Sequence, residues 1–209
     1  MGILRQGILG GFRGKVGNVV GSAWKGLAVI KAMPLSVANP RTAPQVLQRT
    51  KFSQLVILGS KILATIVKPL WDRFSSGMSG YNAFISRNRN AFNPDGMLDL
   101  SNLVIANGRM IAPTTNILGA SATQMNVEIS NPTSDRFALP TDRLFALFIN
   151  ARDNSITFAG DTGFQRGTGS SGTFSIPGDF SGGMYGYLYT AYMRFDGSEV
   201  SDSSTDYID

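Results

Sequence analysis

Apolar positions in the first third of the chain change spacing twice. Through residues 12–33, valine, isoleucine and tryptophan are interrupted by glycines, a pattern that predicts an extended hairpin with turns, bulges or close backbone approach at the glycines. Pro34 and Pro40 then bound an irregular link. After this link the apolar spacing becomes helical, so the hairpin is expected to precede a helical region.

A long helix is expected over about residues 43–68. Thr42 and Gln45 have the spacing of a capping box at its start, and Pro44 is tolerated in a first turn. Apolar residues recur toward Pro69 on a broad face, so we expect this helix to be buried on more than one side. A shorter helix is expected over about residues 79–92, before the turn sequence NPDG.

From residue 98 the chain changes to short runs of strand-forming residues separated by turns. Asn107-Gly108 predicts a hairpin within 103–110, and further strands are expected in 124–130, 143–151, 155–160, 171–177, 184–195 and 204–208. Gly160–Gly172, which contains Asp161 and Arg166, is expected to be a long flexible loop. Six or seven such strands fit an immunoglobulin-like or fibronectin-like β-sandwich, without the Cys-Trp-Cys core of true immunoglobulins.

These elements together predict an α+β protein with two parts. Residues 1–97 are expected to form a basic region of one β-hairpin and two helices, and residues 98–209 the immunoglobulin-like sandwich. The chain is 43% hydrophobic with a mean hydropathy near zero, so it is able to bury a real core.

Composition argues against most kinds of enzyme. The chain has neither cysteine nor histidine, which excludes disulfides, thiolate nucleophiles, His-containing triads and zinc sites built on these residues. Carboxylate, lysine and tyrosine chemistry remain open, but no paired carboxylates stand out. We therefore expect a non-enzymatic protein without a small-molecule substrate or cofactor.

Charge is distributed unevenly along the chain, whose net charge is +5. Residues 1–71 contain ten Lys or Arg and no Asp or Glu, whereas residues 72–209 contain nine basic residues and all fourteen acids. A basic region of this kind attracts either nucleic acid or an acidic protein surface, and we favour protein.

The glycine-rich stretch at residues 10–26 fails as a nucleotide-binding loop. A P-loop would need glycine where Leu9 stands and Ser or Thr where Val16 follows Lys15. The spacing of Gly11, Gly14 and Gly17 does not match a dinucleotide fingerprint either. The glycines are better explained by close packing of the backbone.

A second candidate site is acidic. Carboxylates gather near the C-terminus at Asp196, Glu199, Asp202 and Asp206, but their spacing matches no calcium loop, so we expect a solvated acidic segment rather than a metal site.

Basic and aromatic residues of the first part are the candidate partner-binding residues. They are Arg13, Lys15, Trp24, Lys25, Lys31, Arg41 and Arg49. On nucleic acid the cations would follow the phosphates while Trp24 stacks on bases. On a protein Trp24 would be an apolar anchor and the cations would face an acidic surface.

No membrane span and no secretory signal are evident in the sequence. The longest apolar stretch, from Leu55 to Val67, is interrupted by Lys61 and is typical of a buried helix. The N-terminal residues lack a charged segment followed by a long apolar one.

Three segments carry a resemblance to a known family: GKVGNVVGSAWKG, NPRTAPQVLQRTKF and DGSEVSDSSTDYI. With them the chain resembles, over nearly its whole length, a family of uncharacterised proteins of Bacteroidetes and their phages. The resemblance implies a basic N-terminal region with helices followed by an immunoglobulin-like part, and it implies no catalytic residues.

The expected function is a structural or assembly protein, most simply a bacteriophage virion component located in the virion or the host cytoplasm. Its basic N-terminal region would anchor to other copies of itself or to other virion proteins. Two alternatives remain open: a nucleic-acid-binding protein using residues 1–71, and a ligand-binding immunoglobulin-like module.

Overall fold

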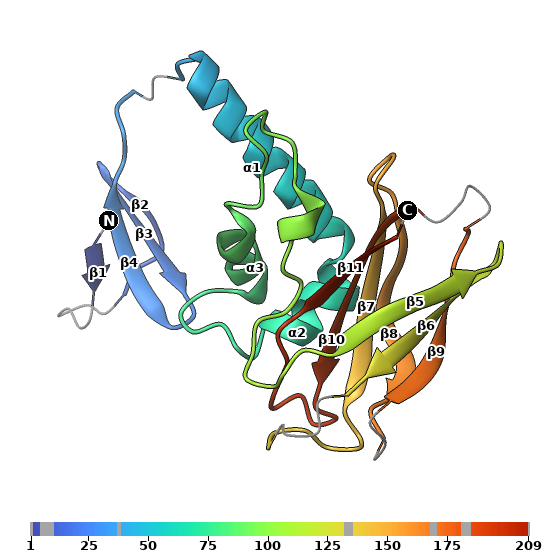
Figure 1. The fold of residues 1–209 in the computed structure, drawn as a ribbon. Helices are drawn as coiled ribbons and strands as arrows, with labels where there is room; N and C mark the ends of the chain where they lie inside the picture. The colour runs from blue at the N-terminus through green and yellow to red at the C-terminus, as the bar shows by residue number, and fades with distance from the viewer. Residues whose placement is uncertain are drawn as a thin grey trace. The chain divides into compact units, whose positions relative to one another are not determined.

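The structure is a computed structural model that describes residues 2–4, 11–36, 39–131, 136–167, 171–180 and 185–208 (Figure 1). It divides into two compact units, Met1–Val46 and Leu47–Asp209. We refer to them as the small unit and the large unit.

The small unit is a four-stranded antiparallel sheet with the strand order β1-β4-β3-β2. Its strands are β1 (Gly2–Leu4), β2 (Gly14–Val16), β3 (Val19–Trp24) and β4 (Leu27–Ala32). The hairpin expected over residues 12–33 is therefore confirmed and extended by β1. Lys25 and Gly26 both have positive φ values, 46° and 81°, in the two-residue turn between β3 and β4, as a type I′ turn requires.

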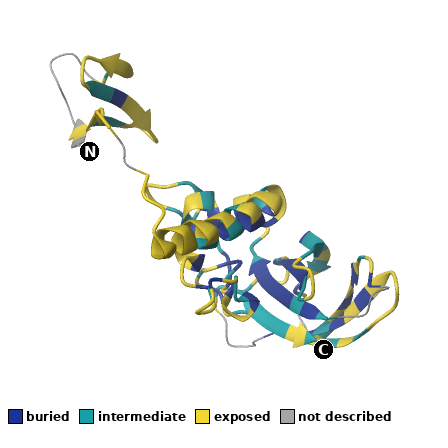
Figure 2. Cartoon of the chain, turned by 90° about the horizontal axis from the view of Figure 1, so that it is seen from above, coloured by how far each residue is buried: buried dark blue, intermediate teal, exposed yellow. Residues whose placement is uncertain are grey.

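This sheet lacks a core among its described residues. Gly21 is the one described residue of the small unit that is buried, and every apolar side chain described there is at least partly exposed to solvent (Figure 2). A Cβ atom at Gly21 would lie 2.6 Å from atoms of the Phe12 ring, so glycine is required for this close approach.

Helices follow the small sheet: the long one begins in the last residues of the small unit, continues into the large unit and is bent. α1 (Ala43–Lys61) is followed by a π-helical turn, η1 (Leu63–Val67), and by the short α2 (Lys68–Trp71), and the axis bends by 70°. The expected continuous helix over 43–68 is thus interrupted. The N–H of Val67 donates to the carbonyl of Ile62 five residues earlier, and Pro69 has no N–H to donate, so the regular helical ladder is interrupted here. It resumes in α2, where the Asp72 N–H donates to the carbonyl of Lys68.

The second helix, α3 (Gly80–Asn88), begins where the sequence predicts it. The Ser79 hydroxyl caps it by accepting a hydrogen bond from the Asn82 N–H at 3.2 Å. The helix ends about four residues earlier than expected. At this end Asn88 turns inward, and its amide donates to the carbonyls of Phe84 and Val104.

Two antiparallel sheets complete the large unit, with the orders β11-β10-β7-β8 and β5-β6-β9. The α+β class is therefore confirmed. The strands are β5 (Thr114–Ala120), β6 (Gln124–Ser130), β7 (Arg143–Asn150), β8 (Ile156–Gln165), β9 (Ser171–Pro177), β10 (Gly186–Met193) and β11 (Ser204–Ile208).

The four-stranded sheet is a middle layer, because strands β7 and β10 are buried on both faces. One face packs against the three-stranded sheet, with Leu144, Phe148 and Leu188 in their shared core. The other face, with Leu147 and Tyr189, packs against the helices. The helices therefore share a core with the β-sheets. The boundary between the two compact units lies between residues 46 and 47, whereas the sequence analysis placed a domain boundary between residues 97 and 98.

Two local expectations in the β-rich part were wrong, and one strand was missed. Asn107-Gly108 forms no hairpin; both residues instead hydrogen-bond to the Asp202 carboxylate. Strand β5 was not expected. Most of Gly160–Gly172 is not a loop, since β8 extends to Gln165 and β9 begins at Ser171, while residues 168–170 lie outside the described part.

Candidate functional site

Three of the seven candidate partner-binding residues lie on one face of the small sheet. Strand register places Lys15, Val20 and Lys31 side by side across β2, β3 and β4. Trp24 pairs with Leu27 at the end of the β3–β4 hairpin. Since alternate residues of a strand share a face, the register defines what we call the Trp24 face. Its members are Ile3, Lys15, Val20, Ser22, Trp24, Leu27, Val29 and Lys31.

Large apolar side chains on the Trp24 face are open to solvent. The exposed fractions are 60% for Ile3, 52% for Trp24 and 47% for Leu27. Both cations are exposed as well, and the face contains no carboxylate. An apolar patch bordered by positive charge has the composition of a contact surface rather than of a solvated sheet face.

The opposite face of the small sheet is partly covered by its own chain. The Phe12 ring lies over Gly21, and a Cβ atom at Gly11 would lie 2.7 Å from the Cβ of Ala28. The backbone of residues 11–12 therefore passes across this face. The Trp24 face has no such cover among the described residues of the small unit.

The other four candidate residues lie elsewhere. Arg13 precedes β2, and Lys25 occupies the turn beside Trp24. Arg41 lies in the link before α1, and Arg49 is exposed on α1 in the large unit. The strand register thus brings together Lys15, Trp24 and Lys31, and adds none of the three arginines to them.

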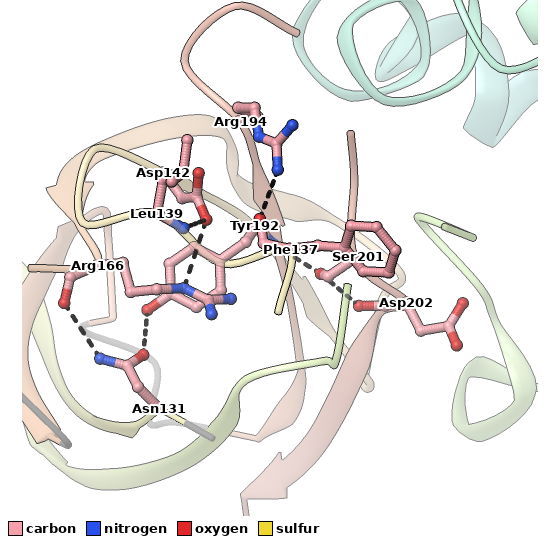
Figure 3. A network of polar contacts seen from close by, with 9 residues as sticks. All are labelled: Asn131, Phe137, Leu139, Asp142, Arg166, Tyr192, Arg194, Ser201 and Asp202. Carbon is pink, nitrogen blue, oxygen red and sulfur yellow. Dashed lines mark hydrogen bonds and ion pairs between the residues drawn. The ribbon is translucent and has the colours of Figure 1, made fainter. Parts of the chain in front are cut away.

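A buried polar network in the large unit was missed by the sequence analysis (Figure 3). The Arg166 guanidinium lies 3.7 Å from the Asp142 carboxylate, with side chains only 4% and 0% exposed. The guanidinium also lies 4.1 Å from the centre of the Tyr192 ring. Tyr192 donates a 2.7 Å hydrogen bond to Asn131, whose amide donates to the Arg166 carbonyl at 3.1 Å.

The network joins the loop at residues 137–142 to the ends of β6, β8 and β10. The Asp142 carboxylate accepts from the N–H of Leu139 at 2.8 Å, and Arg194 donates to the carbonyl of Phe137 at 2.6 Å. Burial raises the pKa of the Tyr192 phenol, so it stays protonated and serves as a hydrogen-bond donor. These contacts fix the loop to the neighbouring strands, which is a structural role. No spacing in the sequence connects Asp142 with Arg166, so only the fold reveals their pairing.

The C-terminal carboxylates point to different partners. Glu199 lies 3.8 Å from Arg109, Asp202 accepts from Asn107, and Asp206 accepts from the Thr115 hydroxyl. Asp196 accepts from the N–H of Ser198. Within the described ranges no group of three acidic side chains is placed to hold a metal ion.

No single described helix is long and apolar enough to cross a membrane. The bent pair Ala43–Lys61 and Leu63–Trp71 meets the criteria of length and composition only when taken together.

A hollow of about 210 Å³ lies beside α1 in the large unit. Its apolar lining includes Ile57, which is 54% exposed, and its rim carries Asp153 and Lys61. We call it the Ile57 hollow; it is lined by Gln54, Ile57, Leu58, Lys61, Leu98, Leu100, Ile149, Asp153 and Asn154.

Comparison with known families gives one match that covers nearly the whole chain. Residues 11–208 match DUF6266, a family of unknown function. The chain belongs to this family. The resemblance to an uncharacterised family noted in the sequence is thus confirmed, while an origin in Bacteroidetes and their phages stays a prediction.

The DUF6266 match extends from the residue before Phe12 to the last residue of β11, so it includes β2–β4 of the small sheet together with the helices and both sheets of the large unit. The Trp24 face is therefore almost entirely within the region that defines the family, with Ile3 outside it. No curated protein matches the chain.

Proposed function

We propose that the protein is a non-enzymatic assembly component, of the kind that forms part of a bacteriophage virion, and that it attaches to neighbouring protein subunits through the Trp24 face. One observation carries this proposal: a regular four-stranded sheet exposes Trp24, Leu27 and Ile3 and buries none of its described apolar side chains. A small sheet needs apolar burial on a face to persist in water, and a protein neighbour supplies it.

Composition supports the non-enzymatic part of the proposal. A chain of 209 residues without histidine or cysteine lacks the side chains that most often act as general bases, nucleophiles and metal ligands. The protein would act in the virion or in the host cytoplasm during assembly.

Nucleic-acid binding is the second candidate, and it uses the same face. Lys15 and Lys31 flank Val20, Trp24 is half exposed nearby on the same sheet face, and the first carboxylate in the sequence is Asp72. Such a surface can pair cations with phosphates and stack a ring on a base of a single strand. We favour protein because Ile3, Leu27 and Val29 add apolar area that a phosphate backbone does not cover.

Photo-crosslinking from the Trp24 face separates the two candidates. A photoreactive phenylalanine analogue placed at position 24 of the full chain, in the cells that produce it, is expected to give adducts whose size on a denaturing gel is not changed by nuclease. The control position is Ala32, which pairs with Val19 on the opposite face and is also exposed. Nuclease-sensitive adducts would contradict attachment to protein, and equal yields at both positions would contradict attachment through the Trp24 face.

We also infer that the seven strands of the large unit form an immunoglobulin-like or fibronectin-like sandwich. If β5, β6, β7, β8, β9, β10 and β11 are named A, B, C, C′, E, F and G, with no strand D, the two sheets have the orders A-B-E and G-F-C-C′. Apart from the missing strand D, this order agrees with the pairing of such sandwiches. The shared core of Val127, Phe148 and Leu188 supports face-to-face packing of the two sheets. Inter-strand NMR contacts in the two sheets would test this order.

A further inference from the structure

The sequence contains one Asn-Gly step, at Asn107 and Gly108. In such a step the side-chain amide is open to deamidation, because glycine has no Cβ atom to hinder attack by its own backbone nitrogen. We propose that Asn107 is a site of this spontaneous modification, and that the Asp202 carboxylate protects it from reaction in the folded chain. The reactants are the chain itself and water.

The reaction has two steps and changes no oxidation state. The backbone nitrogen of Gly108 loses its proton and bonds to Cγ of Asn107, while the Cγ–Nδ2 bond breaks. Ammonia leaves with that proton, and a succinimide ring remains. Water then opens the ring at either carbonyl, which leaves aspartate or isoaspartate at position 107. The groups that must react are therefore the Gly108 nitrogen and the Asn107 carboxamide.

One oxygen of Asp202 binds both reacting groups. Its Oδ1 accepts from the side-chain N–H of Asn107 at 3.1 Å and from the backbone N–H of Gly108 at 3.2 Å. A negative charge beside the Gly108 N–H opposes the loss of its proton, because the resulting amide anion has the same sign. The hydrogen bond to the carboxylate also makes the carboxamide carbon of Asn107 less electrophilic. Both contacts therefore slow the first step.

The backbone of the step is held in place as well. A Cβ atom at Gly108 would overlap the carbonyl oxygen of Val200, so the Gly108 backbone lies directly against Val200. The N–H groups of Arg109 and Met110 donate to the same carbonyl at 3.0 and 3.2 Å. Closure of the succinimide ring needs the peptide plane between Asn107 and Gly108 to rotate. The contacts with Val200 resist this rotation.

The protection depends on local contacts, because the step lies at the surface. Asn107 and Asp202 are both exposed, so water reaches the two residues whenever their contacts open. The rate of deamidation in the folded chain is therefore set by local opening. Hydrogen bonds to a charged group resist opening strongly enough that their loss should make deamidation about tenfold faster.

Deamidation would loosen a junction between the two cores of the large unit. The step lies between Ile105, which is buried in the core beneath the helices, and Met110, which is buried in the core between the sheets. An acid at position 107 faces Asp202 where a donor stood, so repulsion replaces a hydrogen bond. Isoaspartate also lengthens the backbone where it lies against Val200.

Mass spectrometry of peptides from the purified full chain, stored at mildly alkaline pH, tests the inference by measuring conversion of Asn107 to an acid. We expect slow conversion in the folded parent and about tenfold faster conversion in folded Asp202→Ala. The matched control is Asp95→Ala, which removes another exposed aspartate of the large unit and should convert like the parent.

Unfolding removes the tertiary contact without a substitution. In guanidinium chloride the parent and Asp202→Ala should convert at the same rate, and faster than the folded parent, because residue 202 then no longer lies beside the step. Asp202→Asn provides a second variant should Asp202→Ala impair folding, which circular dichroism reports. It keeps an oxygen that accepts hydrogen bonds but removes the charge, and it should convert faster than the folded parent.

Two results would overturn the inference. The first is conversion in folded Asp202→Ala, or in Asp202→Asn if that variant replaces it, that is no faster than in the folded parent. A slower conversion would mean that Asp202 assists the reaction as a base. The second is equal conversion in the folded and the unfolded parent, which would show that the fold gives Asn107 no protection.

Discussion

The buried ion pair of Arg166 and Asp142 gives the sharpest stability prediction. We expect Arg166→Met to lower the free energy of unfolding by about 3–5 kcal/mol, the usual cost of leaving one partner of a buried pair uncompensated. The side chains are 4% and 0% exposed, so water does not replace the lost charge. Methionine keeps most of the apolar contact with the Tyr192 ring.

A second variant separates the charge from the hydrogen bond. Asp142→Asn removes the carboxylate charge but keeps an oxygen that can accept from the Leu139 N–H. We expect it to destabilise as well, because the buried guanidinium then loses its counter-charge. In the double variant neither charge remains. Its loss of unfolding free energy should therefore be smaller than the sum of the losses in the two single variants, by about 2 kcal/mol.

Urea unfolding followed by circular dichroism measures the free energy of unfolding of the two single variants and the double variant. The comparison requires that the dependence of this free energy on urea concentration is the same for all of them. The matched control is Arg143→Met, because Arg143 also pairs with an aspartate, Asp161, at 3.5 Å, but with side chains 42% and 34% exposed. Arg143→Met should lower the free energy of unfolding by less than about 1 kcal/mol. If Arg166→Met costs no more than this control, or if the two single losses add fully, the assignment of a coupled buried pair is refuted.

Three further predictions concern other parts of the fold. Burial raises the pKa of Asp206 from 3.8 to about 6, so the protonated form stabilises the fold at low pH and this contribution disappears as pH rises through about 6. Asp206→Asn should therefore be more stable than the parent at pH 8, by about 1 kcal/mol after allowance for partial exposure, and the gain should vanish near pH 4 in urea titrations. Asn88→Ala removes an amide that hydrogen-bonds Phe84 and Val104, and should cost about 3 kcal/mol by thermal unfolding, whereas the exposed Asn90→Ala should be near neutral. Lys25→Asn should stabilise the small sheet by a few tenths of a kcal/mol, because asparagine accepts positive φ more readily than lysine; slower amide exchange in β3 and β4 would show it, and no change would argue against the type I′ turn.

The hairpin and the start of α3 were predictable because short-range rules determine them. Valine-rich runs broken by glycine give strands and turns, and Ser79 caps the helix three residues before Asn82. The acid-free region through residue 71 can be read directly from the sequence. In contrast, Asn107-Gly108 is a strong local hairpin signal that tertiary contacts override, since Asp202 binds both residues.

By itself, the sequence determined the α+β class, the charge division, the absence of histidine and cysteine chemistry, and Lys15, Trp24 and Lys31 as candidates for binding. Only tertiary structure decided that β7 and β10 are covered on both faces, that Arg166 is buried on Asp142, and that Trp24 and both lysines share one open face. The physical reason is the distance along the chain over which each interaction acts. Local propensity and capping act over a few residues, whereas burial and strand register depend on segments that meet only when the chain has folded.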